Sequence, residues 1–126
     1  MSQKTMSPQT MSQQTINDHI RKLVSDNDVV LFMKGHKGAP QCGFSHQVDQ
    51  ILQHLDVDYK DINVLESMEI REGVKSFTNW PTIPQLYVKG EFVGGCDIIK
   101  EMFQAGELQD LLDAKGVHHA KKTMTA

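Results

Sequence analysis

The sequence predicts an α/β domain in which a small mixed sheet is flanked by helices. Apolar residues at helical spacing alternate along the chain with short runs that are typical of strands. The first two of these runs enclose a helix, and such a βαβ unit pairs its strands in parallel. The last two runs are joined by Lys89-Gly90, which indicates an antiparallel hairpin. The four strands together therefore predict one mixed sheet.

The first half of the domain contains two predicted helices and one strand. Thr15, followed three residues later by Asp18, is a candidate helix start, and the apolar residues after it share one face: Ile16, Ile20, Leu23 and Val24. Residues 29–33 are a continuous apolar run, as expected of a buried strand. Pro40 precedes a second helix, whose apolar stripe comprises Phe44, Val48, Ile51, Leu52 and Leu55.

The second half begins with residues 59–63, which alternate weakly and are predicted as a strand. A third helix ends before Trp80-Pro81 and carries Met68, Ile70, Val74 and Phe77. The hairpin strands are residues 85–88 and 91–93, and Gly94-Gly95 ends the second of them. Asp97 is the predicted cap of a final helix, which extends past Gly106 and carries Ile98, Ile99, Met102, Phe103, Leu108, Leu111 and Leu112.

Residues 16–113 form the predicted domain, which is long enough for a single core. Residues 1–15 read MSQKT MSPQT MSQQT and are predicted to be disordered, because they hold no aromatic or branched aliphatic residue to bury. Residues 114–126 carry three lysines and no acid, and are predicted to be a flexible tail. The pair His118-His119 has no further ligand nearby, so we expect it to be solvated rather than to bind a metal.

Composition argues against several classes of protein. A net charge of −3 does not suit general binding to nucleic acid. No apolar stretch is long enough to span a bilayer. Two cysteines make one bridge at most, and the chain starts with neither a secretory signal nor an arginine-rich transit segment. We therefore expect a reducing compartment, the cytoplasm, with an organelle matrix as the alternative.

Cys42 is placed where a thiol becomes reactive. It follows a strand, a glycine-bearing loop and Pro40, and it stands at the start of the second predicted helix. Free backbone N–H groups and the helix dipole stabilise a thiolate there, and Lys34 and Lys37 add positive charge. The alternative is a small buried hydrophobic residue, which describes most free cysteines. The placement favours a reactive thiol.

The second candidate motif is Trp80-Pro81-Thr82-Ile83-Pro84-Gln85, directly before a predicted strand. A Thr-Ile-Pro segment beside a helix-capping cysteine predicts a cis Ile83–Pro84 bond, although most X–Pro bonds are trans. Such a bend offers the backbone N–H and C=O of Ile83 to an extended peptide.

Four motifs in this order resemble those of the monothiol glutaredoxins of the CGFS type. They are Met33-Lys34-Gly35, Pro40-Gln41-Cys42-Gly43-Phe44-Ser45, Trp80-Pro81-Thr82-Ile83-Pro84-Gln85-Leu86 and Gly94-Gly95-Cys96-Asp97-Ile98. The resemblance covers residues 16–113. It implies a thioredoxin-like fold, glutathione binding, and a [2Fe–2S] cluster held between the two protomers of a homodimer. It also implies apo iron–sulfur acceptors and BolA-like proteins as partners.

The same resemblance implies roles for individual residues. Lys34 would contact the glycine carboxylate of glutathione, and Arg71 would support the same end. Ile83 would pair with the tripeptide backbone, and Cys96 and Asp97 would hold the γ-glutamyl end at a helix N-terminus. Lys34 and Arg71 could instead be ordinary solvated charges. Two cations that converge on one cleft would favour a carboxylate ligand.

Two functions compete for Cys42. In a glutathione-dependent oxidoreductase, its thiolate is catalytic and attacks a glutathionylated protein, but Ser45 stands where a dithiol protein has its resolving cysteine. In a cluster carrier, Cys42 is the protein's metal ligand, shared with the dimer partner. A [2Fe–2S] centre normally takes four thiolates, which two protomers and two glutathiones supply. We expect the carrier function, with weak oxidoreductase activity as the alternative.

A different ligand set is also possible by count. Cys42 and Cys96 from each of two protomers would make four thiolates without glutathione. Gly94-Gly95 before Cys96 and Asp97 after it look more like a helix cap that receives a ligand. His46 lies one helical turn from Cys42 and could share a metal, but four ligands are hard to assemble within one chain, so we expect an exposed histidine.

Overall fold

A four-stranded mixed sheet lies at the centre of the computed structural model, which describes residues 13–120. The strand order is β4-β1-β5-β6. Strand β1 (Val29–Met33) pairs in parallel with β4 (Lys60–Asn63) and antiparallel with β5 (Gln85–Val88). Strand β6 (Glu91–Gly94) completes the hairpin with β5. The predicted mixed sheet of four strands is confirmed.

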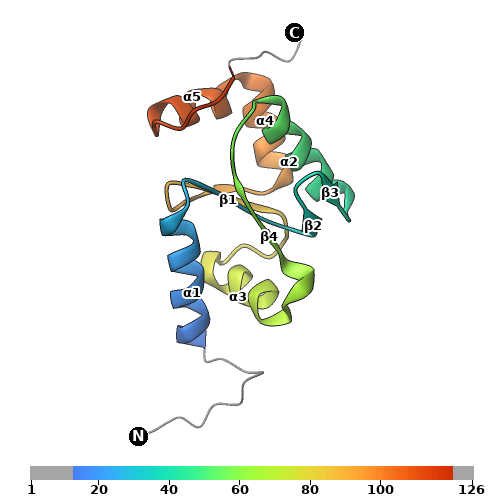
Figure 1. The fold of residues 1–126 in the computed structure, drawn as a ribbon, viewed down its shortest axis with the longest axis vertical. Helices are drawn as coiled ribbons and strands as arrows, with labels where there is room; N and C mark the ends of the chain where they lie inside the picture. The colour runs from blue at the N-terminus through green and yellow to red at the C-terminus, as the bar shows by residue number, and fades with distance from the viewer. Residues whose placement is uncertain (1–12, 121–126) are drawn as a thin grey trace, which may run out of the picture.

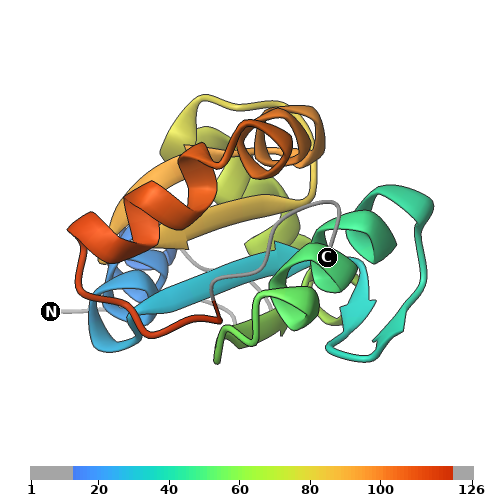
Figure 2. The ribbon, with the colours of Figure 1, turned by 90° about the horizontal axis from the view of Figure 1, so that it is seen from above.

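Helices cover both faces of this sheet (Figure 1 and Figure 2). On one face α1 packs against α3, and on the other face α2 packs against α4, which continues into α5. The bounds of the helices are α1 Gln13–Asp26, α2 Gly43–His54, the short 3-10 helix η1 Val64–Glu66, α3 Met68–Thr78, α4 Cys96–Ala105 and α5 Glu107–Ala114. None of the helices within residues 13–120 is long and apolar enough to cross a membrane.

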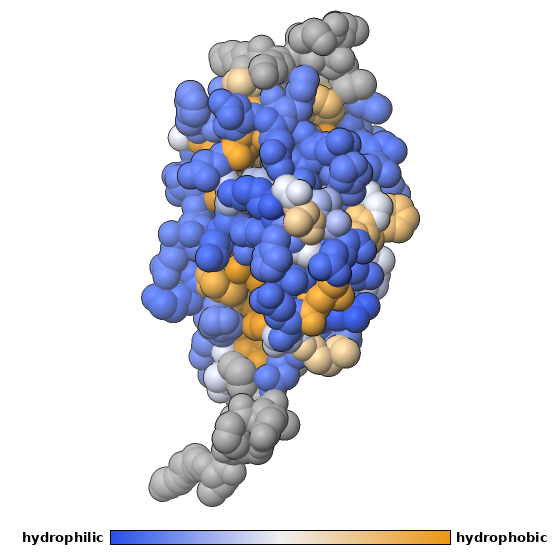
Figure 3. Space-filling model, turned by 45° about the vertical axis from the view of Figure 1, so that its right-hand side comes forward, coloured by the Kyte–Doolittle hydropathy of each residue, from blue (hydrophilic) through white to orange (hydrophobic). Residues whose placement is uncertain are grey.

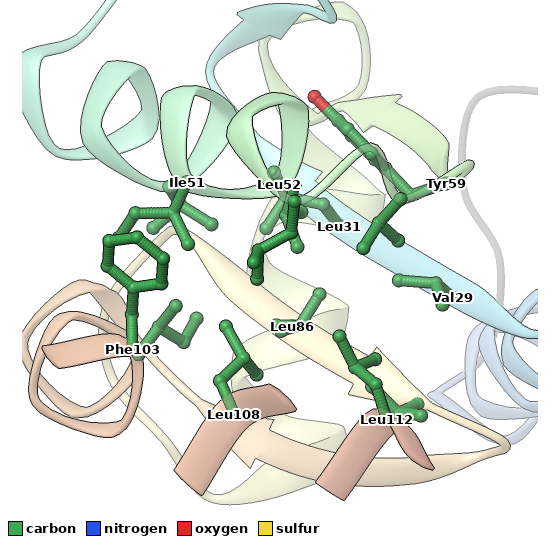
Figure 4. Close-up of a cluster of buried hydrophobic side chains, with 14 of the residues drawn as sticks. Val29, Leu31, Ile51, Leu52, Tyr59, Leu86, Phe103, Leu108 and Leu112 are labelled. Atoms are coloured by element: carbon green, nitrogen blue, oxygen red, sulfur yellow. The ribbon is translucent and has the colours of Figure 1, made fainter. Parts of the chain in front are cut away.

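The alternation of side chains along β1 divides the core into two clusters. Val30 and Phe32 point to the α1–α3 side, whereas Val29, Leu31 and Met33 join the cluster beneath α2, α4 and α5. All five residues are buried, because the strand is central and both faces are covered. Figure 4 shows the larger cluster, in which side chains from α2 meet those from α4 and α5. Each large apolar side chain buried in this way contributes roughly 1.5–3 kcal/mol.

A second, two-stranded ribbon was not predicted from the sequence. Strands β2 (Gly35–His36) and β3 (Ala39–Pro40) pair as an antiparallel ribbon between β1 and Cys42. Strands of two residues leave no alternating pattern to detect. Gly35 has a φ of 98°, and a Cβ atom there would lie 2.6 Å from the carbonyl oxygen of Ala39. The ribbon therefore requires glycine at this position.

Both ends of the domain differ from the predicted boundaries. Helix α1 begins at Gln13, so residues 13–15 are helical, and the rest of the predicted disordered segment lies outside the described residues. The predicted flexible tail is wrong for residues 114–120, the first of which, Ala114, ends α5. Val117 and His119 are buried, and the Ala120 N–H donates to the Leu55 carbonyl at the end of α2.

His119 owes its buried place to specific contacts. Its Nε2 atom lies 2.8 Å from Asp113 Oδ1, and Nδ1 lies 2.9 Å from the Ala120 carbonyl oxygen. The expectation of two solvated histidines is therefore wrong for His119, while His118 is exposed. Residues 121–126 of the predicted tail lie outside the described part of the chain.

Candidate functional site

A cleft of about 490 Å³ opens between α3, the loop before β5 and the N-terminus of α4. Cys42 is not one of its lining residues, but Phe44, two residues further along the chain, and Lys34 both line it. The five residues that the sequence assigned to glutathione all line it: Lys34, Arg71, Ile83, Cys96 and Asp97. These residues come from segments far apart in the chain, and the parallel and antiparallel strand pairs bring them together. The remaining lining residues are Phe44, Lys75, Trp80, Pro81, Thr82, Pro84, Gly95 and Ile98.

Cys42 is the N-cap residue of α2 and is half-buried. Burial by itself raises the pKa of its thiol. Hydrogen bonds from the backbone N–H groups of Ser45 and Phe44 outweigh burial, with help from the positive charge of Lys34 and from the Ser45 hydroxyl. The pKa of Cys42 therefore lies below its ordinary value, as the predicted reactive thiol requires.

Ser45 has a structural role that explains its full burial. Its hydroxyl oxygen accepts a hydrogen bond of 3.0 Å from the backbone N–H of Lys34. The Gln41 N–H in turn donates to the Lys34 carbonyl oxygen at 2.9 Å. Ser45 thus fixes the backbone of Lys34 to the helix that Cys42 begins. A dithiol protein would have its second cysteine at the position of Ser45.

One end of the cleft is cationic. Lys34, Arg71 and Lys75 line it, and the Arg71 Nε–H is buried with no hydrogen-bond partner among residues 13–120. Lys75 was missed in the sequence, although it follows Arg71 at the i+4 spacing that places both on one face of α3. Its Nζ lies 3.5 Å from Glu72 Oε2. Three cations on one wall suit a carboxylate ligand.

The other end of the cleft is the N-terminus of α4. Its N-cap residue is Gly95, and no side chain within the described residues caps this helix. The first N–H groups of the helix are therefore free to bind an anion. A Cβ atom at Gly95 would lie 3.1 Å from Trp80 Nε1 and 3.3 Å from the Pro84 carbonyl oxygen, tighter than an ordinary contact, so glycine favours this close approach. The Trp80 Nε1–H has no hydrogen-bond partner among residues 13–120.

Cys96 differs from Cys42 in its environment. It is buried, and its Sγ atom lies 3.7 Å from Gln47 Oε1. Burial raises the pKa of its thiol, and the negative charges of Asp97 and Cys42 raise it further, with partial compensation by Lys100. Both cysteines are free thiols.

Other candidate features have clear positions. The predicted cis Ile83–Pro84 bond is confirmed. His46 is exposed on α2, as expected. No group of three or more histidine, cysteine or acidic side chains within residues 13–120 is arranged to hold a metal ion.

Apolar side chains surround part of the cleft mouth. Phe44 and Ile98 line the cleft and are exposed, and the other exposed large apolar side chains of the described chain are Leu65 and Met68. Figure 3 shows one face of the molecule, on which apolar side chains form small groups between polar ones. Exposed apolar side chains beside a reactive thiol suit contact with another molecule.

The sheet order, the helix-capping cysteine and the cis proline beside it define a thioredoxin-like protein. The family model described as Glutaredoxin matches residues 29–93. The chain is 54% identical to chloroplastic monothiol glutaredoxin-S14 of Arabidopsis thaliana over 75% of its length, and spans 55% of that protein. It is 51% identical to an uncharacterized monothiol glutaredoxin of Synechocystis over 86% of its length and 95% of that protein.

Solved structures agree with this assignment. Reduced apo GrxS14 from poplar is 45% identical, has a TM-score of 0.74, and aligns over 83% of this chain and 97% of its own. The chain belongs to the monothiol glutaredoxins.

Proposed function

We propose that this protein binds glutathione in the cleft and carries a [2Fe–2S] cluster between two protomers. The observation that carries the proposal is that Cys42, whose pKa is lowered, is near Lys34, which lines a cleft that can bind an anion at either end. Glutathione has a glycine carboxylate at one end and a γ-glutamyl carboxylate at the other. A cationic wall and a free helix N-terminus match that pattern.

The individual residues suit this ligand. Lys34, Arg71 and Lys75 would hold the glycine carboxylate, and the orphan Arg71 Nε–H would gain a partner. The first N–H groups of α4 would bind the γ-glutamyl carboxylate, while Asp97 would pair with the ammonium group. Ile83 would contact the tripeptide backbone. The glutathione thiol would then lie near Cys42.

The cluster is the cargo of the protein in this proposal. Each protomer supplies Cys42 and a bound glutathione thiolate, so a homodimer provides four thiolates. The lowered pKa of Cys42 favours the thiolate that iron requires. Phe44 and Ile98, which are exposed and line the cleft, would cover the cluster edge in the dimer. Apo iron–sulfur proteins and a BolA-like protein would be the acceptors, in a reducing compartment such as the cytoplasm.

A second function, glutathione-dependent oxidoreductase activity, is favoured by the same thiolate. Cys42 would attack the sulfur of glutathione in a glutathionylated protein, release the protein thiolate and become glutathionylated itself. A second glutathione would then restore Cys42 and leave as oxidised glutathione. Ser45 offers no resolving thiol and is occupied with the Lys34 N–H, so we expect this activity to be weak.

Anaerobic reconstitution with iron and sulfide, with and without glutathione, separates the two functions. A carrier gives a brown dimer only when glutathione is present, and Cys42→Ser gives a folded, colourless monomer. Absorbance, iron content and circular dichroism measure these outcomes. Stoichiometric iron on Cys42→Ser would remove Cys42 from the site, and a colourless wild-type protein that reduces glutathione mixed disulfides would favour the enzyme.

A further inference from the structure

A buried carboxylate on α2 takes no part in the proposed function. Asp49 is only 3% exposed. Tyr59 donates its hydroxyl to Asp49 Oδ1 in a short hydrogen bond, and Gln53 Nε2 donates to both carboxylate oxygens at 3.1 and 3.2 Å. The third donor is the backbone N–H of Gly38, at 3.4 and 3.3 Å from the two oxygens. Asp49 therefore joins α2 to the β2–β3 ribbon.

Gly38 lies at the tip of that ribbon, and the base of the ribbon adjoins the site. The neighbouring Lys37 N–H donates to Asp61 Oδ2 at 2.8 Å, so two carboxylates hold the tip from opposite elements, α2 and β4. At the base, Lys34 N–H donates to Ser45 and Gly35 N–H donates to Asn63 Oδ1 at 2.9 Å. Strands of two residues are too short to hold their own position.

Two anchor points on α2 fix the orientation of the ribbon relative to Cys42. Ser45 holds its base and Asp49 holds its tip, and both belong to the helix that Cys42 caps. Without Asp49, the tip keeps its contact with Asp61 of β4 but loses its link to α2, so the ribbon can shift relative to that helix. We expect such a shift to reach Lys34, which directly precedes the ribbon. The position of the Lys34 ammonium relative to the Cys42 thiol and the cleft then changes.

The composition of the network also indicates a positioning role. A buried carboxylate is costly, and an apolar side chain of similar size at such a position is often neutral or stabilising. Burial raises the pKa of Tyr59, and the Asp49 contact raises it further, so the hydroxyl remains a donor. The Lys37 Nζ atom lies 4.4 Å from the centroid of the Tyr59 ring, which gives the tip one more contact with the network.

We propose that Asp49 is a positioning residue, which orients the β2–β3 ribbon and thereby sets Lys34 for glutathione binding beside Cys42. The proposal deepens the proposed function and rests on it for the identity of the ligand. Asp49 is not among the residues that line the cleft, so its role is not direct contact with a ligand bound there. Its effect passes through Gly38 and the ribbon.

The test compares Asp49→Leu with the wild-type protein in the reduced, metal-free state. NMR measures hydrogen exchange at the Gly38 amide and the amide shifts of Lys34 and Gln41, and a titration with glutathione gives the dissociation constant. We expect Gly38 to exchange faster, the two shifts to move, and the dissociation constant to rise about tenfold, which corresponds to 1.4 kcal/mol. The melting temperature is measured alongside, to separate positioning from stability.

Two variants serve as controls. Tyr59→Phe removes the hydroxyl group that donates to Asp49 but leaves the hydrogen bond between the Gly38 N–H and Asp49. Asp58→Asn removes a charge 3.8 Å from Lys37 Nζ and leaves both anchor residues, Ser45 and Asp49, in place. Both should bind glutathione within about twofold of the wild type, a change under 0.5 kcal/mol. Asp49→Asn keeps one acceptor oxygen in the same shape and should give an intermediate dissociation constant. It replaces Asp49→Leu if the leucine variant does not fold.

Three results would overturn the proposal. The first is hydrogen exchange at the Gly38 amide that is the same in Asp49→Leu as in the wild type. The second is faster Gly38 exchange in Asp49→Leu with no change in the glutathione dissociation constant. The third is a loss of glutathione affinity in Tyr59→Phe as large as in Asp49→Leu. Absence of glutathione binding by the wild type would refute the proposed function instead. The Lys34 and Gln41 shifts then decide the role of Asp49 without a ligand, because unchanged shifts in Asp49→Leu mean that it does not position the ribbon.

Discussion

Two free thiols in one small domain have opposite environments. Cys42 meets backbone N–H donors and Lys34 at a helix start, whereas Cys96 is buried beside Asp97. The two thiols therefore differ in reactivity because of the groups around them, although both are cysteines. The same comparison supplies internal controls for tests at the residue scale.

The first prediction uses the pH dependence of alkylation. Because the thiolate reacts, the rate at each cysteine rises with pH through its own pKa. We expect the midpoint for Cys42 to lie below the ordinary cysteine value and that for Cys96 to lie above it. Lys34→Gln should raise the Cys42 midpoint and leave the Cys96 midpoint in place. Peptide mass spectrometry after iodoacetamide treatment follows both, and coincident midpoints would contradict the assignment.

The second prediction distinguishes the two ligand sets for a cluster. If glutathione supplies two of the four thiolates, Cys96→Ser should still form a brown dimer with a near-normal spectrum that depends on glutathione. If Cys96 is a ligand, the variant loses two of four thiolates, and a hydroxyl is a poor replacement at iron–sulfur centres. Visible absorbance after anaerobic reconstitution decides between them. A colourless Cys96→Ser would exclude the glutathione-ligated cluster.

At the scale of elements, the cleft depends on close packing between the Trp80 loop and the start of α4. Gly95 permits this approach, since a Cβ atom there would lie 3.1 Å from Trp80 Nε1 and 3.3 Å from the Pro84 carbonyl oxygen, while Gly94 makes room for the Ile98 side chain within the first turn of α4. The same short segment leaves the first N–H groups of α4 uncapped. Packing and binding are thus linked at one helix terminus.

The third prediction follows from Gly95. Gly95→Ala introduces a methyl group 3.1 Å from Trp80 Nε1 and should destabilise the domain by roughly 1–3 kcal/mol, as overpacking does. The shift of the Trp80 loop should also weaken glutathione binding. Chemical denaturation and a glutathione titration measure the two effects. Gly43→Ala is the stability control, because nothing lies within 4 Å of a Cβ atom there.

The fourth prediction concerns residues 115–120, which pack onto the domain after α5. Val117→Ala should lower the free energy of unfolding by about 1–2 kcal/mol, because each buried CH₂ contributes roughly 0.8 kcal/mol. His118→Ala, at the adjacent exposed residue, should stay within about 0.5 kcal/mol of the wild type. Thermal or urea unfolding of both variants provides the measurement. Equal stabilities would mean that this segment contributes nothing to the fold.

At the scale of the whole molecule, the sequence predicted features that have a local cause. Helical periodicity and a continuous apolar run identify α2 and β1, and the Lys89-Gly90 pair identifies the hairpin. The burial of Val117 and His119 was missed, because it depends on contacts with distant or neighbouring elements that no periodicity reveals.

The candidate site divides in the same way. The resemblance to the monothiol glutaredoxins identified five residues for one ligand, and the fold brings them to one cleft: Lys34, Arg71, Ile83, Cys96 and Asp97. The lining role of Lys75 and the anchoring role of Asp49 become visible only in three dimensions. A lysine or an aspartate on a helix is usually solvated, so sequence gives no reason to select either one.

The last prediction is the stoichiometry of the assembled protein. One protomer supplies a single thiolate at Cys42 and, in the described residues, no further group arranged for metal binding. A glutathione-ligated cluster therefore requires two protomers, and its mass should be twice 14.2 kDa plus the cargo. Iron, sulfide and glutathione should each equal protomers in number, since the two irons of one cluster are shared by two chains. Light scattering and chemical analysis of the same sample measure these quantities.

Chelation of the iron should return the protein to a monomer, because the cluster and its two glutathiones bridge the protomers. A dimer that persists after the iron is removed would show that protein contacts alone hold it together, and two irons per protomer would rule out a shared cluster.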